Sequence, residues 1–191
     1  MLIRMRRRVA LVLLIGLVSS PREAHVSQIH YQTVTLAELV ERSELILIVK
    51  SAKPAQRQIN IPIGAPGPDS LVAAGQQKKE APAFVRVLSR CEVLGALSKA
   101  GAELVGKTIE IDSAHWQETL ALHKSYYLEG ISESPIYERY QPAEPVPEPE
   151  PRPSIVFLRR EGASGYAFVV DGAVERGKSR AAIEKLLRGR K

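Results

Sequence analysis

The stretch TVTLAELVERSELILIVK, residues 33–50, carries the clearest structural signal in the chain. Thr35 is followed three residues later by Glu38, which is the spacing of a capping box at the start of a helix. The apolar residues that come next recur at helical spacing. Residues 45–49 are then all apolar and mostly β-branched, which predicts a strand buried on both faces. The stretch therefore predicts a short helix that leads directly into a core strand.

Three later segments have the pattern of strands. In AFVRVLSRCEVLGAL, residues 83–97, the apolar positions that include Val85 and Val87 alternate with charged residues, as on a strand with one wet face. GKTIEID, residues 106–112, predicts a further strand entered through a turn. In SIVFLRREGASGYAFVV, residues 154–170, two apolar runs flank a glycine-containing turn, which predicts a β-hairpin.

The remaining segments predict loops and a last helix. Residues 54–82 contain five prolines and three glycines and predict a long flexible surface loop that begins where Lys53-Pro54 ends the preceding strand. Residues 141–153 include six prolines and predict an extended, flexible, proline-rich linker. KSRAAIEKLLRGRK, residues 178–191, predicts a short helix with apolar residues on its inner face.

Together these segments predict a mainly β (α+β) fold. Four or five strands separated mostly by loops suit a small antiparallel sheet that curls into a partly open barrel, flanked by two short helices. Residues 27–191 are expected to form one domain. An α+β sandwich is the alternative. A parallel doubly wound sheet is disfavoured because full crossover helices between the strands are missing.

The amino-terminal residues predict export. MLIRMRRRVALVLLIGLVSS has four arginines, then ten mostly apolar residues, then small residues, which is the order of a secretory signal peptide. Ten residues span only about 15 Å as a helix, roughly half of a bilayer core, so no stable membrane span is expected after cleavage. We assign residues 1–26 to the signal peptide, with an uncleaved anchor as the alternative, and expect a periplasmic or extracellular protein.

Charge and cysteine content narrow the function classes. The chain has a net charge of +6, but the signal peptide carries four of its positive charges. Residues 21–175 hold sixteen basic and twenty acidic residues, whereas residues 176–191 hold seven basic residues and one acidic. A mildly acidic body with a basic tail does not favour nucleic-acid binding. A single cysteine, Cys91, leaves no internal disulfide, so a hydrophobic core must stabilise the domain.

The order of the segments resembles that of a diffuse group of exported bacterial proteins of uncharacterised function. The similar pieces are the capped helix TLAELVERSE before LILIVK, the strand ending in CEVLG, the strand GKTIEI, and the hairpin IVFLRREGASGYAFV. The small barrel of that group is of the OB type, like that of netrin-like and metalloproteinase-inhibitor domains. The resemblance implies an OB-like barrel. It does not imply protease inhibition, because those inhibitors use an amino-terminal cysteine that this chain lacks.

Aromatic side chains gather in HWQETLALHKSYYLEGISESPIYERY, residues 115–140. If residues 114–127 are helical, Trp116, Leu120, His123 and Tyr127 share one face, which would dock on the barrel. A turn-rich loop follows. The tyrosines around it are the candidate binding residues, because tyrosine at a barrel mouth suits a ligand or a partner protein. They are Tyr126, Tyr127, Tyr137 and Tyr140. Packing of the loop without a ligand is the competing interpretation.

The same stretch offers an alternative metal site. His115 and Glu118 are three residues apart and can meet on one side of a helix, as a metal requires of an imidazole and a carboxylate. His123 is the candidate for a further ligand, although packing in the core is the competing interpretation. No nucleophile elbow, phosphate loop, paired-cysteine motif or zinc-protease motif is present, and no cofactor is indicated.

From these observations we expect an exported, non-catalytic binding domain for a protein, a peptide or an envelope component, which it would contact through the loop at residues 126–140. A metal-dependent periplasmic hydrolase that uses His115 and Glu118 is the alternative. A structural envelope protein whose basic tail, residues 176–191, touches anionic surfaces is a third hypothesis. The sequence does not indicate an oligomeric state.

Overall fold

A computed structural model describes residues 30–65, 81–131, 133–142, 152–162 and 165–189. The predicted signal peptide, residues 1–26, lies outside the described residues, as does most of the proline-rich linker predicted at 141–153. Within the described part of the chain, no helix combines the length and the apolar composition needed to cross a bilayer.

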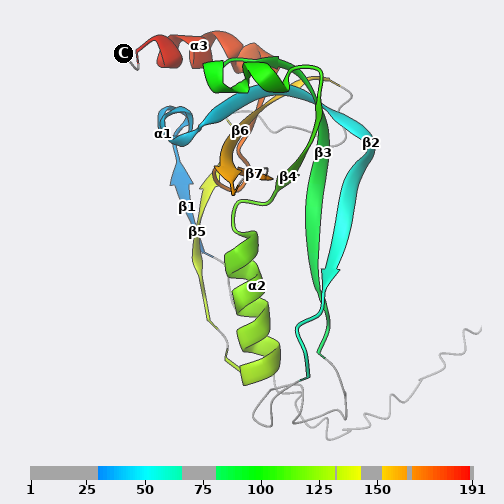
Figure 1. Ribbon diagram of the computed structural model, residues 1–191. Coiled ribbons are helices and arrows are strands. Elements are labelled where there is room, and N and C mark those ends of the chain that lie inside the picture. Colours follow the sequence, from blue (N-terminus) through cyan, green and yellow to red (C-terminus); the bar gives the residue numbers. More distant parts are fainter. Residues whose placement is uncertain (1–29, 66–80, 132, 143–151, 163–164, 190–191) are drawn as a thin grey trace, which may run out of the picture.

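The centre of the molecule is a five-stranded β-barrel, formed by β2 (Leu45–Ile61), β3 (Phe84–Ala96), β4 (Thr108–Asp112), β6 (Ser154–Glu161) and β7 (Gly165–Phe168). The strands follow the order β2-β3-β4-β7-β6, and β6 pairs again with β2 (Figure 1). The fold is therefore mostly β with a barrel and a few short helices, as predicted.

Two details of the barrel differ from the prediction. It is closed rather than partly open, because Leu45–Val49 of β2 pairs with Ser154–Leu158 of β6. It is mixed rather than antiparallel, because β4 and β7 run parallel through the pairs Ile111 with Tyr166 and Asp112 with Ala167. Parallel neighbours need a long crossover, which is supplied here by the segment between β4 and the β6–β7 hairpin.

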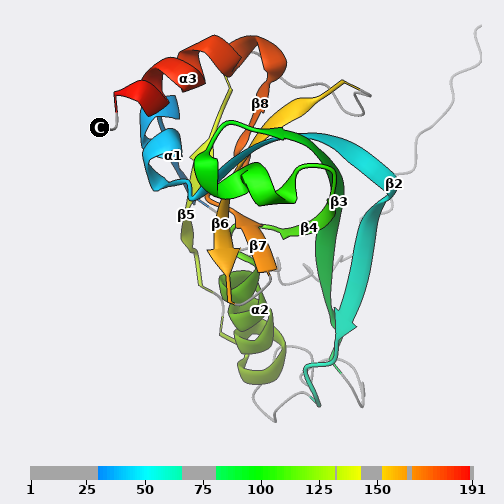
Figure 2. The same cartoon turned by 45° about the horizontal axis from the view of Figure 1, so that its top comes forward.

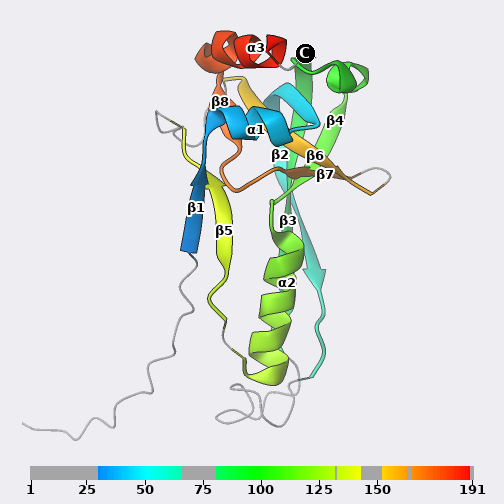
Figure 3. The same ribbon diagram turned by 90° about the vertical axis from the view of Figure 1, so that its left-hand side faces the viewer.

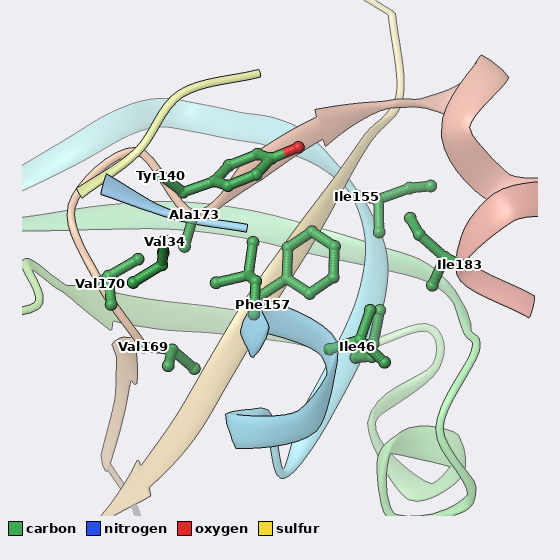
Figure 4. Close-up of a cluster of buried hydrophobic side chains, with 11 residues drawn as sticks. Val34, Ile46, Tyr140, Ile155, Phe157, Val169, Val170, Ala173 and Ile183 are labelled. Atoms are coloured by element: carbon green, nitrogen blue, oxygen red, sulfur yellow. The ribbon is translucent and has the colours of Figure 1, made fainter. Parts of the chain in front are cut away.

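Two hydrophobic clusters lie on opposite sides of β2. Leu45, Leu47 and Val49 belong to the cluster that also holds Val93, Leu104, Ile109, Ile111, Val156 and Leu158 from around the barrel. Ile46 belongs to a second cluster, which Ile183 of the last helix joins (Figure 4). The prediction that residues 45–49 form a strand covered on both faces is therefore confirmed.

Short helices cover this framework. α1 (Leu36–Arg42) begins at the predicted capping box, in which the side chain of Thr35 accepts from the backbone of Glu38 and the Glu38 carboxylate accepts from the backbone of Thr35. α3 (Arg180–Arg188) packs near α1 and buries Ile183. The 3-10 helix η1 (Lys99–Leu104) lies over one end of the barrel (Figure 2). α2 (Trp116–Lys124), which the π-helix η2 (Ser125–Glu129) continues, lies toward the other end.

Three strands outside the barrel were not predicted. β1 (His30–Val34) and β5 (Ile136–Tyr140) pair in parallel and form a separate two-stranded sheet, visible from the side in Figure 3. β8 (Val174–Arg176) adds to the outer edge of β6 and leads through the 3-10 turn η3 (Gly177–Ser179) into α3. Tyr137 and Tyr140, expected in or beside a loop, thus belong to a strand.

The strand at residues 45–49 does not end at Lys53-Pro54, as the sequence suggested. β2 continues to Ile61 and pairs with β3 as far as Phe84, so the two strands form a long ribbon that projects from the barrel (Figure 1). Pro54 lies in the irregular part of β2 between the pairs Ser51 with Cys91 and Gln56 with Ser89. A proline is tolerated at such a bulge because no ladder hydrogen bond needs its missing N–H.

The ribbon also corrects the prediction of which face of β3 is wet. Val85 and Val87, expected inside, are 48% and 37% exposed. Phe84 and Leu88 are buried instead. Beyond the barrel, the face of β3 that carries Val85 and Val87 is exposed to solvent. The opposite face of β3 packs against α2 (Figure 3).

A buried polar network ties the outer elements together. The Tyr140 hydroxyl donates to Oε1 of Glu175, and the Ser179 hydroxyl donates to Oε2 of the same carboxylate at 2.6 Å. Tyr140 and Glu175 are only 5% and 6% exposed. Burial, together with the hydrogen bond to Glu175, raises the pKa of Tyr140 well above that of a free tyrosine.

We predict that Tyr140→Phe lowers the free energy of unfolding by about 1–3 kcal/mol at pH 7, because a buried hydrogen bond to a charged group is lost. In the native protein the raised pKa keeps Tyr140 protonated, whereas an unfolded tyrosine ionises from about pH 10. The contribution of the hydroxyl is therefore complete below about pH 10 and falls as the pH rises toward the native pKa.

Urea unfolding of both proteins between pH 7 and pH 11 checks this expectation. The difference in stability between the native chain and Tyr140→Phe should shrink above about pH 10. A difference that stays constant or grows there would contradict the assignment of the network.

Candidate functional site

The aromatic helix expected at residues 114–127 is anchored to the barrel by charged groups. Trp116, its only tryptophan, lies under the guanidinium of Arg86, 3.9 Å from the ring centroid. The indole N–H of Trp116 donates to Oε2 of Glu161 at 2.9 Å. Arg159 donates to the carbonyl oxygen of Ala114 at 2.7 Å, directly before the helix. Trp116 therefore packs toward the barrel, as predicted, but against an arginine.

A buried ion pair completes this anchor. Nε and Nη2 of Arg86 donate to the two carboxylate oxygens of Asp112, with Nε 2.7 Å from Oδ1. The side chain of Asp112 is 5% exposed and that of Arg86 is 25% exposed. Removing one partner of such a pair is strongly destabilising, because the other charge is left buried and uncompensated.

The four candidate tyrosines do not form one exposed surface. Tyr137 and Tyr140 are 7% and 5% exposed, with the ring of Tyr137 stacked on His115 at a centroid distance of 4.5 Å. Tyr137 packs against His115 at the start of α2, and Tyr140 belongs to the hydrophobic cluster that α1 and α3 cover, so both serve in packing. Tyr126 and Tyr127 are half-buried in η2, their rings in edge contact at 4.9 Å. Only these two keep any surface that a partner could reach.

The candidate metal ligands point to different neighbours. Nε2 of His115 lies 3.4 Å from the carbonyl oxygen of Glu138, and Glu118 is exposed. Nε2 of His123 donates to the carbonyl oxygen of Pro82 at 2.8 Å, with the rings of Phe84 and Tyr127 beside it. Across the described residues, no three His, Cys, Asp or Glu side chains are grouped so that they could hold a metal.

A polar cleft of about 550 Å³ opens on the outer wall of the barrel, over β2, β3 and β4 and beside the start of β7. We call it the wall cleft. Its charged lining residues are Arg57, Arg86, Lys107, Glu110 and Asp112, its apolar ones are Ile59, Leu88, Leu104, Ile109 and Tyr166, and Thr108 and Gly165 complete it.

The depth of the wall cleft follows from the short parallel pairing of β4 with β7. Only two residue pairs join these strands, at the carboxyl end of β4. The start of β4 is therefore not covered by β7, and side chains of the barrel core, Leu104, Ile109 and Tyr166, reach the cleft. The result is an apolar floor with charged walls, a combination typical of ligand sites.

The two guanidinium–carboxylate pairs in the cleft differ in burial. Nε of Arg57 donates to Oε1 of Glu110 at 2.9 Å, and a second bond joins Nη2 to the other oxygen. The side chains of this pair are 52% and 34% exposed. The bond from Arg57 holds the pKa of Glu110 below its usual range. An exposed pair of this kind stabilises a fold by at most about 1 kcal/mol, so it exchanges easily with other partners.

Arg90 lies beside the same carboxylate. Its Nε is 3.6 Å from Oε1 of Glu110, outside hydrogen-bonding distance. Glu110 thus faces two guanidinium groups but holds only Arg57 by hydrogen bonds. Lys107, directly before β4, is exposed. The hydrogen bond from Arg160, together with the charge of Lys107, lowers the pKa of Glu103.

Sequence reasoning missed this site for a specific reason. Arg57 fell in the segment interpreted as a loop, so it could not be placed beside Glu110. The alternation of Arg86, Leu88 and Arg90 was a usable signal, because it marks one face of a strand. Which residues face them across the sheet depends on the register of β3 with β4, which the sequence does not specify.

Fold and site together define the class of protein: a small, mostly β protein with a closed barrel and a charged cleft in its wall. No family model, no curated protein and no solved structure matches the chain.

Two matched substitutions distinguish the pairs in the cleft. Arg86→Met should lower the free energy of unfolding by about 3 kcal/mol or more, because Asp112 stays buried without its partner. Arg57→Met should lower it much less, because Glu110 remains hydrated. Chemical denaturation monitored by circular dichroism measures both, and equal losses would contradict the assigned difference in burial.

Proposed function

We propose that this chain is an exported, non-catalytic binding module of the OB-like type and that its ligand lies in the wall cleft. The strand order supports the OB-like assignment. Numbered within the barrel, the strands run 1-2-3-5-4 and return to 1, with strands 3 and 5 parallel. A Greek-key barrel of the OB type has this strand order. In this chain, the pairing of β2 with β6 closes the five strands into a barrel.

The position of the wall cleft carries the proposal. OB-type barrels bind extended ligands on the face of their second and third strands, between the 1–2 and 4–5 loops. In this chain those strands are β3 and β4, and the cleft lies over both. Its volume of about 550 Å³ falls in the range of about 300–1,000 Å³ that is common for ligand sites.

The charges in the cleft favour binding over catalysis. Both carboxylates, Glu110 and Asp112, are held by guanidinium groups, and the hydrogen bond from Arg57 lowers the pKa of Glu110. A general base or acid needs a proton affinity near the working pH, which such pairing opposes. Export, inferred from residues 1–26, makes a protein, a peptide or an envelope component the expected kind of partner.

The earlier alternatives gain less support. A hydrolase built on His115 and Glu118 would need further ligands, and none of the described residues completes the set. A contact through residues 126–140 would have to use Tyr126 and Tyr127 alone, because Tyr137 and Tyr140 are buried.

Filling the cleft should abolish binding without unfolding the barrel. Thr108 is exposed and lines the cleft, so Thr108→Trp places an indole ring in the ligand's position. Immobilised native protein should recover a component of the envelope fraction, identified by mass spectrometry, that Thr108→Trp recovers at less than a tenth of the native level.

Thr33→Trp is the matched control. Thr33 is also an exposed threonine on a strand, but it lies on β1, outside the cleft residues. It should recover the component as the native chain does. Undiminished recovery by a folded Thr108→Trp variant would place the ligand elsewhere on the protein.

A further inference from the structure

The wall cleft has more positive groups than negative ones. Three cations line it, and Arg90 approaches from the side, whereas its only carboxylates are Glu110 and Asp112. The Asp112 carboxylate is occupied by Arg86 in a pair that is too buried to exchange. The groups available to a ligand are therefore Arg57 and Lys107, while Arg90 stays beside Glu110.

The arrangement of Arg57 and Glu110 indicates what these groups bind. A guanidinium that donates two parallel bonds to one carboxylate matches a second carboxylate equally well. More than half of the Arg57 side chain is exposed, so an incoming carboxylate can reach it. In the free protein, Glu110 occupies the position on Arg57 that a ligand carboxylate would take. When a ligand displaces Glu110, Arg90 remains beside this carboxylate and balances its charge.

The second cationic position is Lys107. It directly precedes β4, is exposed and lines the same cleft as Arg57. Arg57 and Lys107 come from different segments of the wall, so a ligand that meets both needs two separated carboxylates. A peptide in the polyproline conformation with acidic residues at every third position presents carboxylates on one side about 9 Å apart.

We propose that the ligand of the wall cleft is an extended acidic peptide, with glutamate or aspartate at every third position and apolar residues between. This assignment rests on the proposed function of the cleft. One ligand carboxylate replaces Glu110 on Arg57, and the next binds Lys107. The apolar side chains lie on the floor formed by Leu88, Ile109 and Tyr166.

A phosphate polymer fits the cleft less well. Nucleic acids and other polyphosphates are bound by broad basic faces that neutralise many charges. Here two of the cations, Arg57 and Arg86, already hold carboxylates, and much of the lining is apolar. A peptide combines separated carboxylates with apolar side chains, so it can contact both the cations and the apolar lining of the cleft.

Fluorescein-labelled GEPLEPLEG and its counterpart GQPLQPLQG test the proposal by fluorescence anisotropy, with the native chain at 20 and 200 mM NaCl. The glutamate peptide should bind about tenfold more tightly than the glutamine peptide at low salt, and the difference should narrow at high salt. Inorganic tripolyphosphate should be a poor competitor.

Variants locate the binding site. Lys107→Ala and Arg57→Ala should each weaken the glutamate peptide by about five- to tenfold, because each removes one charge-assisted contact. Glu110→Gln should strengthen it, because the internal competitor for Arg57 loses its charge. Lys124→Ala is the control, an exposed lysine on α2 outside the cleft residues, and should bind as the native chain does.

Several results would overturn the assignment: equal binding of the two peptides, binding that Lys107→Ala and Arg57→Ala leave unchanged, or tighter binding of tripolyphosphate than of the glutamate peptide. If Thr108→Trp still abolishes capture of the envelope component while the glutamate peptide fails to bind, the cleft is the site and only the ligand class is wrong. If Thr108→Trp captures normally, the proposed function fails as well.

Discussion

The pairing of Leu45–Val49 with Ser154–Leu158 is the constraint on which the rest of the structure depends. It joins the first strand of the barrel to the fourth across more than 100 residues of chain and so closes the barrel. It also gives β2 and β6 two buried faces, one toward the barrel core and one toward the cluster under α1 and α3. Strands buried on both faces must be apolar throughout, which explains the LILIV and IVFL runs.

Because β2 and β6 close the barrel on one side, the wall formed by β3 and β4 on the other side is available for a ligand. There, α2 reaches the outer face of β3 at Arg86, the wall cleft is lined mainly by β2, β3 and β4, and the β4–β7 seam is only two pairs long. The charged ladder on this wall combines a buried pair, Arg86 with Asp112, and an exposed pair, Arg57 with Glu110. The first stabilises the barrel and anchors α2, while the second is weak enough to yield to a ligand.

Local signals in the sequence predicted the local structure well. The Thr35–Glu38 capping box, the strand at 45–49 and the helix that buries Ile183 all depend on neighbours within a few residues. The predictions that were wrong concern residues whose structure depends on segments far away in the sequence. Pro54 was interpreted as the end of a strand, but the partner strand β3 holds β2 together across the bulge. Tyr137 and Tyr140 were expected beside a loop, but they lie in β5, where the parallel pairing with β1 and the docking of His115 bury them.

The sequence by itself determined the central parts of the barrel strands and the helices α1 and α3, because apolar periodicity and capping act over one or two turns of chain. It also determined that the core would be apolar and free of internal disulfides. Only the tertiary structure decided that the barrel closes, that β4 and β7 run parallel, and that Arg57 meets Glu110 from 53 residues away. Register between strands follows from the packing of the whole sheet, so residues that are far apart in the chain become one cleft only when the barrel forms.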